Sequence, residues 1–349
     1  MKLIPGTHEL RARRISREAE GVVSVVLARD DGCDLPEFTS GAHIDLVLSS
    51  DLIRQYSLCS DPSVRDEWTI AVLLEPDSRG GSEYVHTVLQ PGMPVWVAGP
   101  RNNFPLIEAD DYLFIAGGIG ITPLLPMVRE VDRQGKNWAL LYGGRSRASM
   151  AFLDDLSRFG SRVTVMPQDE CGLLDLSAAI GPLRADAAVY CCGPEPLISA
   201  VESTCAELGR SAPRVERFKA RQVPEDALDE RANSAFSLVL SESGKQVTVA
   251  ADKPIIEVLD EEGIFVLTAC EAGICGTCET EVVSGTPDHR DDYLTPEERA
   301  TNKTMMVCVS RSKTPVLVLK LLGRRRGERT AGGAFRRPFA LRAGLAAVR

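Results

Sequence analysis

The chain has 349 residues, enough for two or three domains, and its 44% hydrophobic and 26% charged content is ordinary for globular domains. A formal net charge of −9 argues against nucleic acid as the main partner, and no apolar run reaches the length of a membrane span. The N-terminal stretch has no signal-peptide core, so we expect a cytoplasmic protein without a membrane or nucleic-acid partner.

The first third of the chain has the pattern of a small antiparallel β-barrel. Short β-branched runs broken by turn residues are typical of such barrels. These runs cover residues 20–27, 42–48, 68–74 and 90–100. We therefore predict a barrel domain over residues 1–107.

Two segments of this barrel carry residue types suited to a flavin. Arg54 supplies a permanent cation for a phosphate, Tyr56 a flat ring and Ser57 a hydrogen bond. The glycine-serine turn at residues 80–82 is suited to an anion, and we expect Ser82 to open a helix over residues 83–89. A surface turn plus a core tyrosine is the alternative interpretation. The residues expected at the flavin are Arg54, Gln55, Tyr56, Ser57, Val72, Leu73, Gly80, Gly81 and Ser82.

From residue 108 the pattern changes to strands that alternate with helices, which predicts a parallel, doubly wound sheet over residues 108–222. The expected strands cover residues 112–116, 138–143, 162–166 and 187–193. The expected helices cover residues 123–134, 151–159 and 195–208.

Three glycine-bearing loops follow the strands of this sheet, where ligands bind in open α/β folds. The first is not a G-x-G-x-x-G sequence; we expect Thr122 to be the N-cap of the next helix and Pro123 its first residue. Cys192 is expected near a nicotinamide ring, or is simply a small buried residue. The residues expected at the dinucleotide are Gly117, Gly118, Gly120, Ile121, Thr122, Pro123, Arg145, Ser146, Cys192, Gly193 and Pro194.

The polar residues 223–234 are expected to form a linker to a β-grasp domain over residues 235–323, with one helix over residues 255–262. The arginine-rich residues 324–349 are interpreted as a basic, flexible tail.

Three cysteines of the β-grasp domain have the C-x4-C-x2-C spacing, and a fourth follows in a strand-like run. This is the ligand pattern of a plant-type [2Fe–2S] cluster. The predicted ligands are Cys270, Cys275, Cys278 and Cys308.

Two other interpretations of these cysteines fit the sequence less well. Zinc sites commonly need two C-x2-C pairs, and the sequence has one. Disulfides need an oxidising compartment, to which nothing in the sequence points.

Taken together, the flavin segments, the loop Gly117–Pro123, the Cys192-Gly-Pro sequence and the four cysteines resemble the reductases of Rieske-type oxygenase systems. That family includes phthalate dioxygenase reductase and the vanillate demethylase reductases. The resemblance implies FMN rather than FAD, and NADH as the donor, with Arg145 and Ser146 toward the adenosine end. It places Phe218 near the flavin ring.

The resemblance implies an NADH-dependent oxidoreductase that passes electrons through FMN to the [2Fe–2S] cluster and then to a terminal oxygenase. Tyr56, Thr122 and Cys192 are expected at the reacting rings. NADPH stays open, because Arg145 and Arg147 could hold a 2′-phosphate. The alternatives are a reductase for a cytochrome P450 or a carnitine-type monooxygenase, and a non-enzymatic electron carrier or redox sensor.

The chain is not expected to be the oxygenase itself, because its histidines lack ligand spacing and are interpreted as surface or turn residues. They are His8, His43, His86 and His289. The acidic stretches 279–281 and 288–292 are interpreted as solvated faces.

Overall fold

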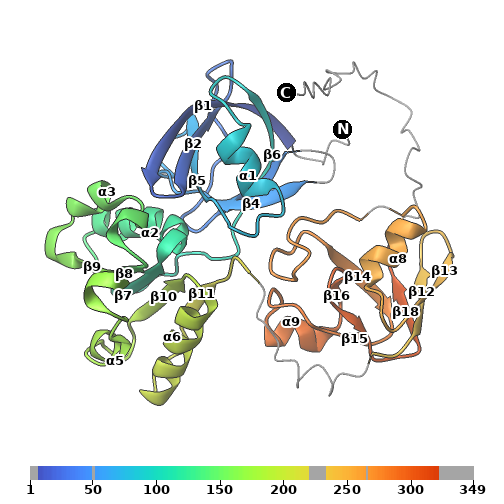
Figure 1. Ribbon diagram of the computed structural model, residues 1–349. Coiled ribbons are helices and arrows are strands. Elements are labelled where there is room, and N and C mark those ends of the chain that lie inside the picture. Colours follow the sequence, from blue (N-terminus) through green and yellow to red (C-terminus); the bar gives the residue numbers. More distant parts are fainter. Residues whose placement is uncertain (1–6, 49–51, 220–232, 265, 322–349) are drawn as a thin grey trace, which may run out of the picture.

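The computed structural model describes residues 7–48, 52–219, 233–264 and 266–321. Three structural units follow one another along the chain, and Figure 1 shows them as three lobes, in blue, green and orange. Most of the predicted linker and the whole predicted tail lie outside the described residues. Within the described part no helix is long and apolar enough to cross a membrane.

The first unit is the predicted antiparallel barrel, with strand order β4-β3-β6-β1-β2-β5. An antiparallel bridge between Leu58 and Ile70 brings the ends of the sheet together. The inward side chains of β1, β2, β3 and β5 form one buried core. The elements are β1 (Thr7–Ala19), β2 (Val22–Ala28), β3 (His43–Val47), β4 (Ile53–Ser57), β5 (Glu67–Leu73), α1 (Gly81–Thr87) and β6 (Pro94–Arg101).

The second unit is the predicted parallel sheet, with strand order β11-β10-β7-β8-β9. Every residue of β10 is buried, which agrees with a sheet covered on both faces. Its strands are β7 (Asp111–Gly117), β8 (Asn137–Gly144), β9 (Val163–Pro167), β10 (Ala188–Cys192) and β11 (Arg214–Glu216). Its helices are α2 (Ile121–Arg133), α3 (Leu153–Ser157), α4 (Gln168–Cys171), α5 (Leu176–Ile180) and α6 (Glu195–Glu207), with 3-10 turns at Gly118–Gly120, Arg147–Ser149 and Gly160–Arg162.

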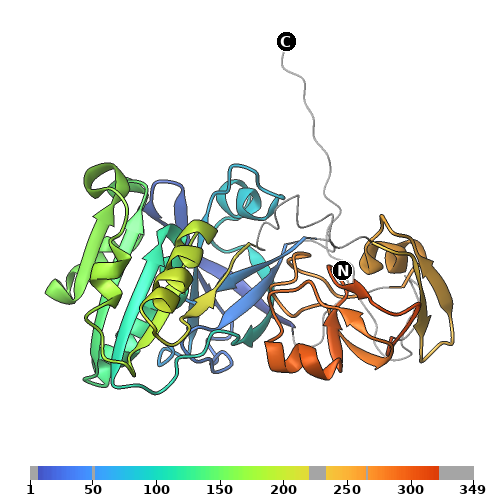
Figure 2. The same ribbon diagram turned by 90° about the horizontal axis from the view of Figure 1, so that it is seen from below.

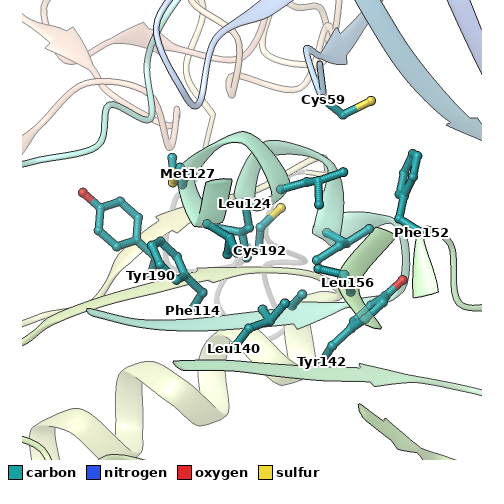
Figure 3. Close-up of a cluster of buried hydrophobic side chains, with 14 of the residues drawn as sticks. Cys59, Phe114, Leu124, Met127, Leu140, Tyr142, Phe152, Leu156, Tyr190 and Cys192 are labelled. Carbon is teal, nitrogen blue, oxygen red and sulfur yellow. The ribbon is translucent and has the colours of Figure 1, made fainter. Parts of the chain in front are cut away.

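The barrel and the parallel sheet share one hydrophobic core. Cys59 of the barrel belongs to the same buried cluster as Leu124 and Cys192, and Figure 3 shows it on the barrel side of helix α2. The junction is also hydrogen-bonded, since Arg129 donates to the carbonyl oxygen of Cys59 over 3.0 Å. These two units are therefore packed together by apolar surface as well as by polar contacts.

The third unit, the ferredoxin-like unit, is a mixed sheet with strand order β13-β12-β18-β14-β16, in which β12 and β18 are parallel. One helix packs over it, as a β-grasp fold requires, and Figure 1 shows the unit as the orange lobe. The elements are β12 (Phe236–Leu240), β13 (Gln246–Val249), α8 (Ile255–Glu261), β14 (Glu279–Ser284), β15 (Pro287–Asp288), α9 (Pro296–Thr301), β16 (Thr304–Met306), β17 (Arg311–Ser312) and β18 (Val316–Leu319).

Several sequence-based expectations about local structure are wrong. Thr122 is not an N-cap: helix α2 begins at Ile121 after Gly120, and the Thr122 hydroxyl donates to the Ile119 carbonyl instead. Helix α1 begins at Gly81, one residue before Ser82. Cys308 lies in a turn that follows β16, not in a strand.

Two buried polar residues also contradict the expected solvated or surface positions. His43 is only 5% exposed, on β3 inside the barrel. Asp291 is 2% exposed, and its buried carboxylate accepts hydrogen bonds from the Leu294 amide and the Ser310 hydroxyl. Asp291 therefore stabilises the ferredoxin-like unit rather than lying on a solvated face.

Candidate functional site

The loop that carries three of the four predicted cluster ligands runs from Cys270 to Cys278, between helix α8 and strand β14. Gly273 and Gly276 have φ values of 70° and 73°, a left-handed conformation that favours glycine. Backbone amides point at the sulfurs: the Ala272 amide lies 3.3 Å from the Cys270 Sγ atom. The loop therefore folds around its own thiols.

The four thiols form two pairs. The Cys278 and Cys308 sulfurs are 3.2 Å apart, and Cys270 hydrogen-bonds to Cys275. The hydrogen bond from Cys270 is the main reason that the pKa of Cys275 falls to about 6, and the pKa of Cys270 is raised correspondingly. The pKa of Cys278 is likewise lowered by its hydrogen bond with Cys308, whose pKa is raised.

This pairing fits a two-iron cluster better than a single metal ion. Each iron of a [2Fe–2S] cluster takes two thiolates, which is what two adjacent pairs offer. A structural zinc site needs four ligands around one point. In the described parts of the chain, no three His, Cys, Asp or Glu side chains converge to hold one ion.

The predicted flavin segment lies on β4, at the edge of the barrel. Arg54 donates to the carbonyl oxygens of Ile53 and Arg79, over 2.8 and 2.6 Å. No carboxylate of the described residues forms an ion pair with it, and partial burial lowers the pKa of the guanidinium. A Cβ atom at Gly81 would lie 2.4 Å from the Arg54 Cγ atom, so the glycine turn and the arginine are in contact. A partly buried cation against a glycine turn fits a phosphate group.

The other flavin residues divide between the barrel surface and the core. Tyr56 is partly buried, and burial raises its pKa to about 12. The Gln55 amide donates to Asp45 over 2.9 Å. Val72 is buried in the barrel core, and its carbonyl oxygen accepts a hydrogen bond from the His86 Nε2 atom over 2.9 Å. Leu73 packs against the core that the barrel shares with the parallel sheet. The Ser82 hydroxyl bonds to Ser78, 3.0 Å away.

The structure adds Glu216, which no sequence motif indicated. Its carboxyl group hydrogen-bonds to Ser57, and burial raises its pKa to about 8. The second oxygen, Oε2, is buried without a partner among the described residues. Glu216 also lies beside Cys192 in the parallel pairing of β10 and β11. The signal that the sequence offered for this residue was an acidic side chain two positions before Phe218.

Two of the three glycine loops of the parallel sheet, those after β7 and β10, meet at its carboxyl edge. A Cβ atom at Gly120 would lie 2.2 Å from the Cys192 carbonyl oxygen, and one at Gly117 would lie 2.7 Å from the Pro194 Cδ atom. At Gly118, whose φ is 54°, an added Cβ would meet nothing within 4 Å. The loops after β7 and β10 are therefore packed together, with open space beside Gly118 that suits a dinucleotide.

The remaining predicted residues lie at different depths. Cys192 is fully buried below helix α2 (Figure 3), and burial raises its pKa well above the usual value. Ile121, Thr122 and Pro123 are buried in the first turn of α2. Arg145 is exposed, whereas Ser146 caps the 3-10 turn Arg147–Ser149. Phe218 is 41% exposed.

These three sites define a flavin- and iron–sulfur-dependent oxidoreductase of the multidomain type. Residues 239–313 match the family described as 2Fe-2S iron-sulfur cluster binding domain, and residues 114–203 match the oxidoreductase NAD-binding domain. The chain is 40% identical over 314 residues to the phenoxybenzoate dioxygenase subunit beta of Ectopseudomonas oleovorans, covering 89% of this chain and 97% of that protein.

Two solved structures extend the comparison. Phthalate dioxygenase reductase matches with a TM-score of 0.68 and 33% identity, over 90% of this chain and 98% of that one. An intact type IV self-sufficient cytochrome P450 monooxygenase matches with a TM-score of 0.82 and 39% identity, over 92% of this chain. The chain spans only 43% of that P450 chain.

The chain therefore belongs to the phthalate dioxygenase reductase family, as the resemblance predicted. It is an oxidoreductase with an NAD-binding domain, a flavin fold whose flavin is FMN in that family, and a [2Fe–2S] domain. The predicted fold class and cofactors are confirmed. As a reductase component it passes electrons from NADH through the flavin and the cluster to an oxygenase partner.

Proposed function

We propose that this chain supplies single electrons to a Rieske-type oxygenase carried on a separate polypeptide. The observation that carries the proposal is the position of the cysteine loop. Cys275 packs in one apolar cluster with Val47 of β3 and with Ile53 of β4, the strand that also carries Arg54. Because a proposed cluster ligand and the proposed flavin segment lie in one contact region, electrons could pass directly from the flavin to the cluster within one chain.

In this proposal the barrel binds FMN through β4 and the glycine turn. Arg54, Gly80, Gly81 and Ser82 would hold the phosphate, while Tyr56 and Ser57 would orient the ring, together with Gln55, Val72 and Leu73. Phe218 would cover the ring from the carboxyl end of the NAD-binding unit. Held by these residues, FMN would supply the chemistry that divides the electron pair of NADH into single electrons.

The loops of the parallel sheet would position NADH. Gly117, Gly118 and Gly120 allow close approach of the backbone, with Ile121, Thr122 and Pro123 opening helix α2. Cys192, Gly193 and Pro194 would lie at the nicotinamide end, with Arg145 and Ser146 toward the adenosine. Arg147 forms an ion pair with Glu170 over 2.8 Å, which leaves it less suited to a 2′-phosphate and supports NADH over NADPH.

The ligands of the [2Fe–2S] cluster are proposed to be Cys270, Cys275, Cys278 and Cys308. The proposed domain boundaries are residues 1–107, 108–222 and 235–323, with a linker at 223–234 and a tail at 324–349. We also propose a cytoplasmic location, which the six cysteines outside the proposed ligand set support, because they are free thiols and thiols persist in reducing compartments.

A matched pair of cysteine variants tests this electron route. In Cys275→Ser we expect loss of the visible iron–sulfur absorption and of NADH-driven cytochrome c reduction, while NADH still reduces the flavin. The exposed Cys171 gives the control, since Cys171→Ser should change none of these. Full cytochrome c reduction by Cys275→Ser would refute the proposed order.

A cytochrome P450 partner is the second candidate, because a self-sufficient P450 monooxygenase contains a region similar to this chain. Reconstitution of this reductase with each type of oxygenase distinguishes the two candidate partners. With NADH in excess, a Rieske-type oxygenase should turn over its substrate with this reductase, and a free P450 domain should not. Turnover only by the P450 would overturn the Rieske assignment.

A further inference from the structure

The ferredoxin-like unit contacts the barrel through a small apolar patch. Four buried residues form its centre, Val47 and Ile53 from the barrel and Ala269 and Cys275 from the cysteine loop. Trp96 packs against them from the barrel side. Figure 2 shows blue barrel strands lying beside the orange unit. So small a patch leaves the orientation of the two units to be fixed by other contacts.

Two arginines of the barrel bind the cysteine loop at its two sides. The Arg79 Nη2 atom donates to the Cys270 carbonyl oxygen over 3.1 Å. The Arg101 Nη2 atom donates to the Thr277 hydroxyl oxygen over 3.4 Å. Thr277 is itself hydrogen-bonded to a proposed ligand, since its amide lies 3.5 Å from the Sγ atom of Cys275, two residues earlier. Each arginine therefore acts on the backbone or side chain next to a proposed cluster ligand.

Arg101 is held in place before it meets the loop. Its Nη2 atom lies 2.8 Å from both carboxylate oxygens of Asp45, which is fully buried. Gln55 donates to the same carboxylate over 2.9 Å. A hydrogen-bonded path thus runs from Gln55 in the flavin segment, through Asp45 and Arg101, to Thr277 in the cysteine loop. Fixing the cation in advance lowers the entropy cost of docking.

We propose that Arg79 and Arg101 are positioning residues that clamp the cysteine loop onto the flavin barrel and so set the rate of electron transfer to the cluster. The inference rests on the proposed function. Thiolate ligands are anionic, so two guanidinium groups at the edges of their loop favour the docked arrangement. Neither arginine is assigned to flavin or NADH binding.

The test uses the full-length holoprotein with four variants: Arg79→Gln, Arg101→Gln, the double variant and Arg101→Lys. Arg13→Gln is the control, because Arg13 donates to the Arg29 carbonyl elsewhere on the barrel. Stopped-flow absorption follows flavin reduction and cluster reduction separately after mixing with NADH. Hydrogen–deuterium exchange of residues 53–57 and 266–278 reports docking without any turnover.

We expect flavin reduction to stay within twofold of the wild type in every variant. Cluster reduction in the double variant should slow at least tenfold, with exchange in both segments several-fold faster and an unchanged cluster spectrum. Arg101→Lys should recover part of the loss. Wild-type cluster reduction should slow at high salt, which screens the contact.

Unchanged cluster reduction and unchanged exchange in the double variant would overturn the clamp. So would a slower cluster reduction with no change in exchange, because the arginines would then act otherwise than by docking. Failure of the wild type itself to pass electrons from NADH to the cluster would instead refute the proposed function.

Discussion

The ring of Tyr293 lies directly over Gly276 in the cysteine loop. A Cβ atom at Gly276 would be only 2.3 Å from the Tyr293 Cζ atom, and the φ of 73° at this glycine is itself unfavourable for other residues. The tyrosine therefore closes one side of the loop and requires a residue without a side chain beneath it.

Gly276→Ala should accordingly lower the cluster content. The left-handed backbone alone costs roughly 1–2 kcal/mol for a residue with a Cβ, and the contact with Tyr293 adds to it. Iron per chain and visible absorption measure the effect. Gly244→Ala is the matched control, because its φ is 68° and nothing lies within 4 Å of the added carbon. Equal iron loss in both variants would show that the Tyr293 contact is unimportant.

Arg54→Ala should weaken flavin retention. A charge-assisted hydrogen bond to a phosphate contributes on the order of 1.5–3 kcal/mol, so we expect roughly 10- to 100-fold weaker binding. Flavin content after dialysis and a fluorescence titration measure it. Arg65→Ala, which breaks an exposed ion pair with Glu37 on the same barrel, should retain its flavin. Unchanged flavin content in Arg54→Ala would contradict the assignment.

In Glu216→Gln, the rate of flavin reduction by NADH should no longer depend on pH between 7 and 9. Burial raises the pKa of this carboxyl to about 8, so it is protonated at pH 7 and ionises as the pH rises to 9. Because it hydrogen-bonds to Ser57, the ionisation changes the charge beside the proposed flavin site. We expect the rate of flavin reduction by NADH to change between pH 7 and 9 in the wild type and to be flat in the variant. Glu207→Gln on the exposed side of α6 should keep the wild-type profile.

His43 should make the barrel sensitive to acid. Burial, with the nearby Arg101 cation, lowers its pKa from 6.5 to about 4. The unfolded chain therefore binds more protons than the native one between these values, so stability is lost as the pH falls from about 6.5 toward 4. The expected loss is about 2 kcal/mol between pH 7 and pH 5, since each pKa unit is about 1.4 kcal/mol.

Thermal unfolding of the wild type and of His43→Gln at pH 7, 6 and 5 measures this loss. The stability difference between them should shift in favour of the variant as the pH falls. The partly exposed His8 on β1 gives the control, and His8→Gln should follow the wild type. Parallel curves for His43→Gln and the wild type would contradict the prediction.

The elements that the sequence predicted are those whose residues are patterned locally. The β-branched run at Val22–Ala28, the buried strand at Asp111–Gly117 and the cysteine spacing each specify their structure within a few residues. Strand β1 was missed because it is rich in arginine and only two of its residues are buried. Its pairing with β2 and β6 forms it, and such long-range pairing leaves no local pattern.

The parts of the sites that were missed depend on contacts between distant segments. Asp45 and Arg101 are 56 residues apart, and their pairing exists only because β3 and β6 are neighbours. Glu216 reaches Ser57 from the opposite unit. The sequence predicts a strand at Cys308 because the residues before it are apolar. In the structure these residues are buried in the core of the unit, and the chain at Cys308 forms a turn. Burial was predictable there, but its cause was not.

The junction between the barrel and the NAD-binding unit and the junction between the barrel and the ferredoxin-like unit differ in whether the units they join can be exchanged between genes. Separating the barrel from the NAD-binding unit would leave a continuous apolar core exposed on both fragments, so the pair can be inherited only as a block. The ferredoxin-like unit keeps its own core and touches the barrel over a few side chains. It is the portion that evolution, or an engineer building chimeras, can exchange while the remaining fragment still folds.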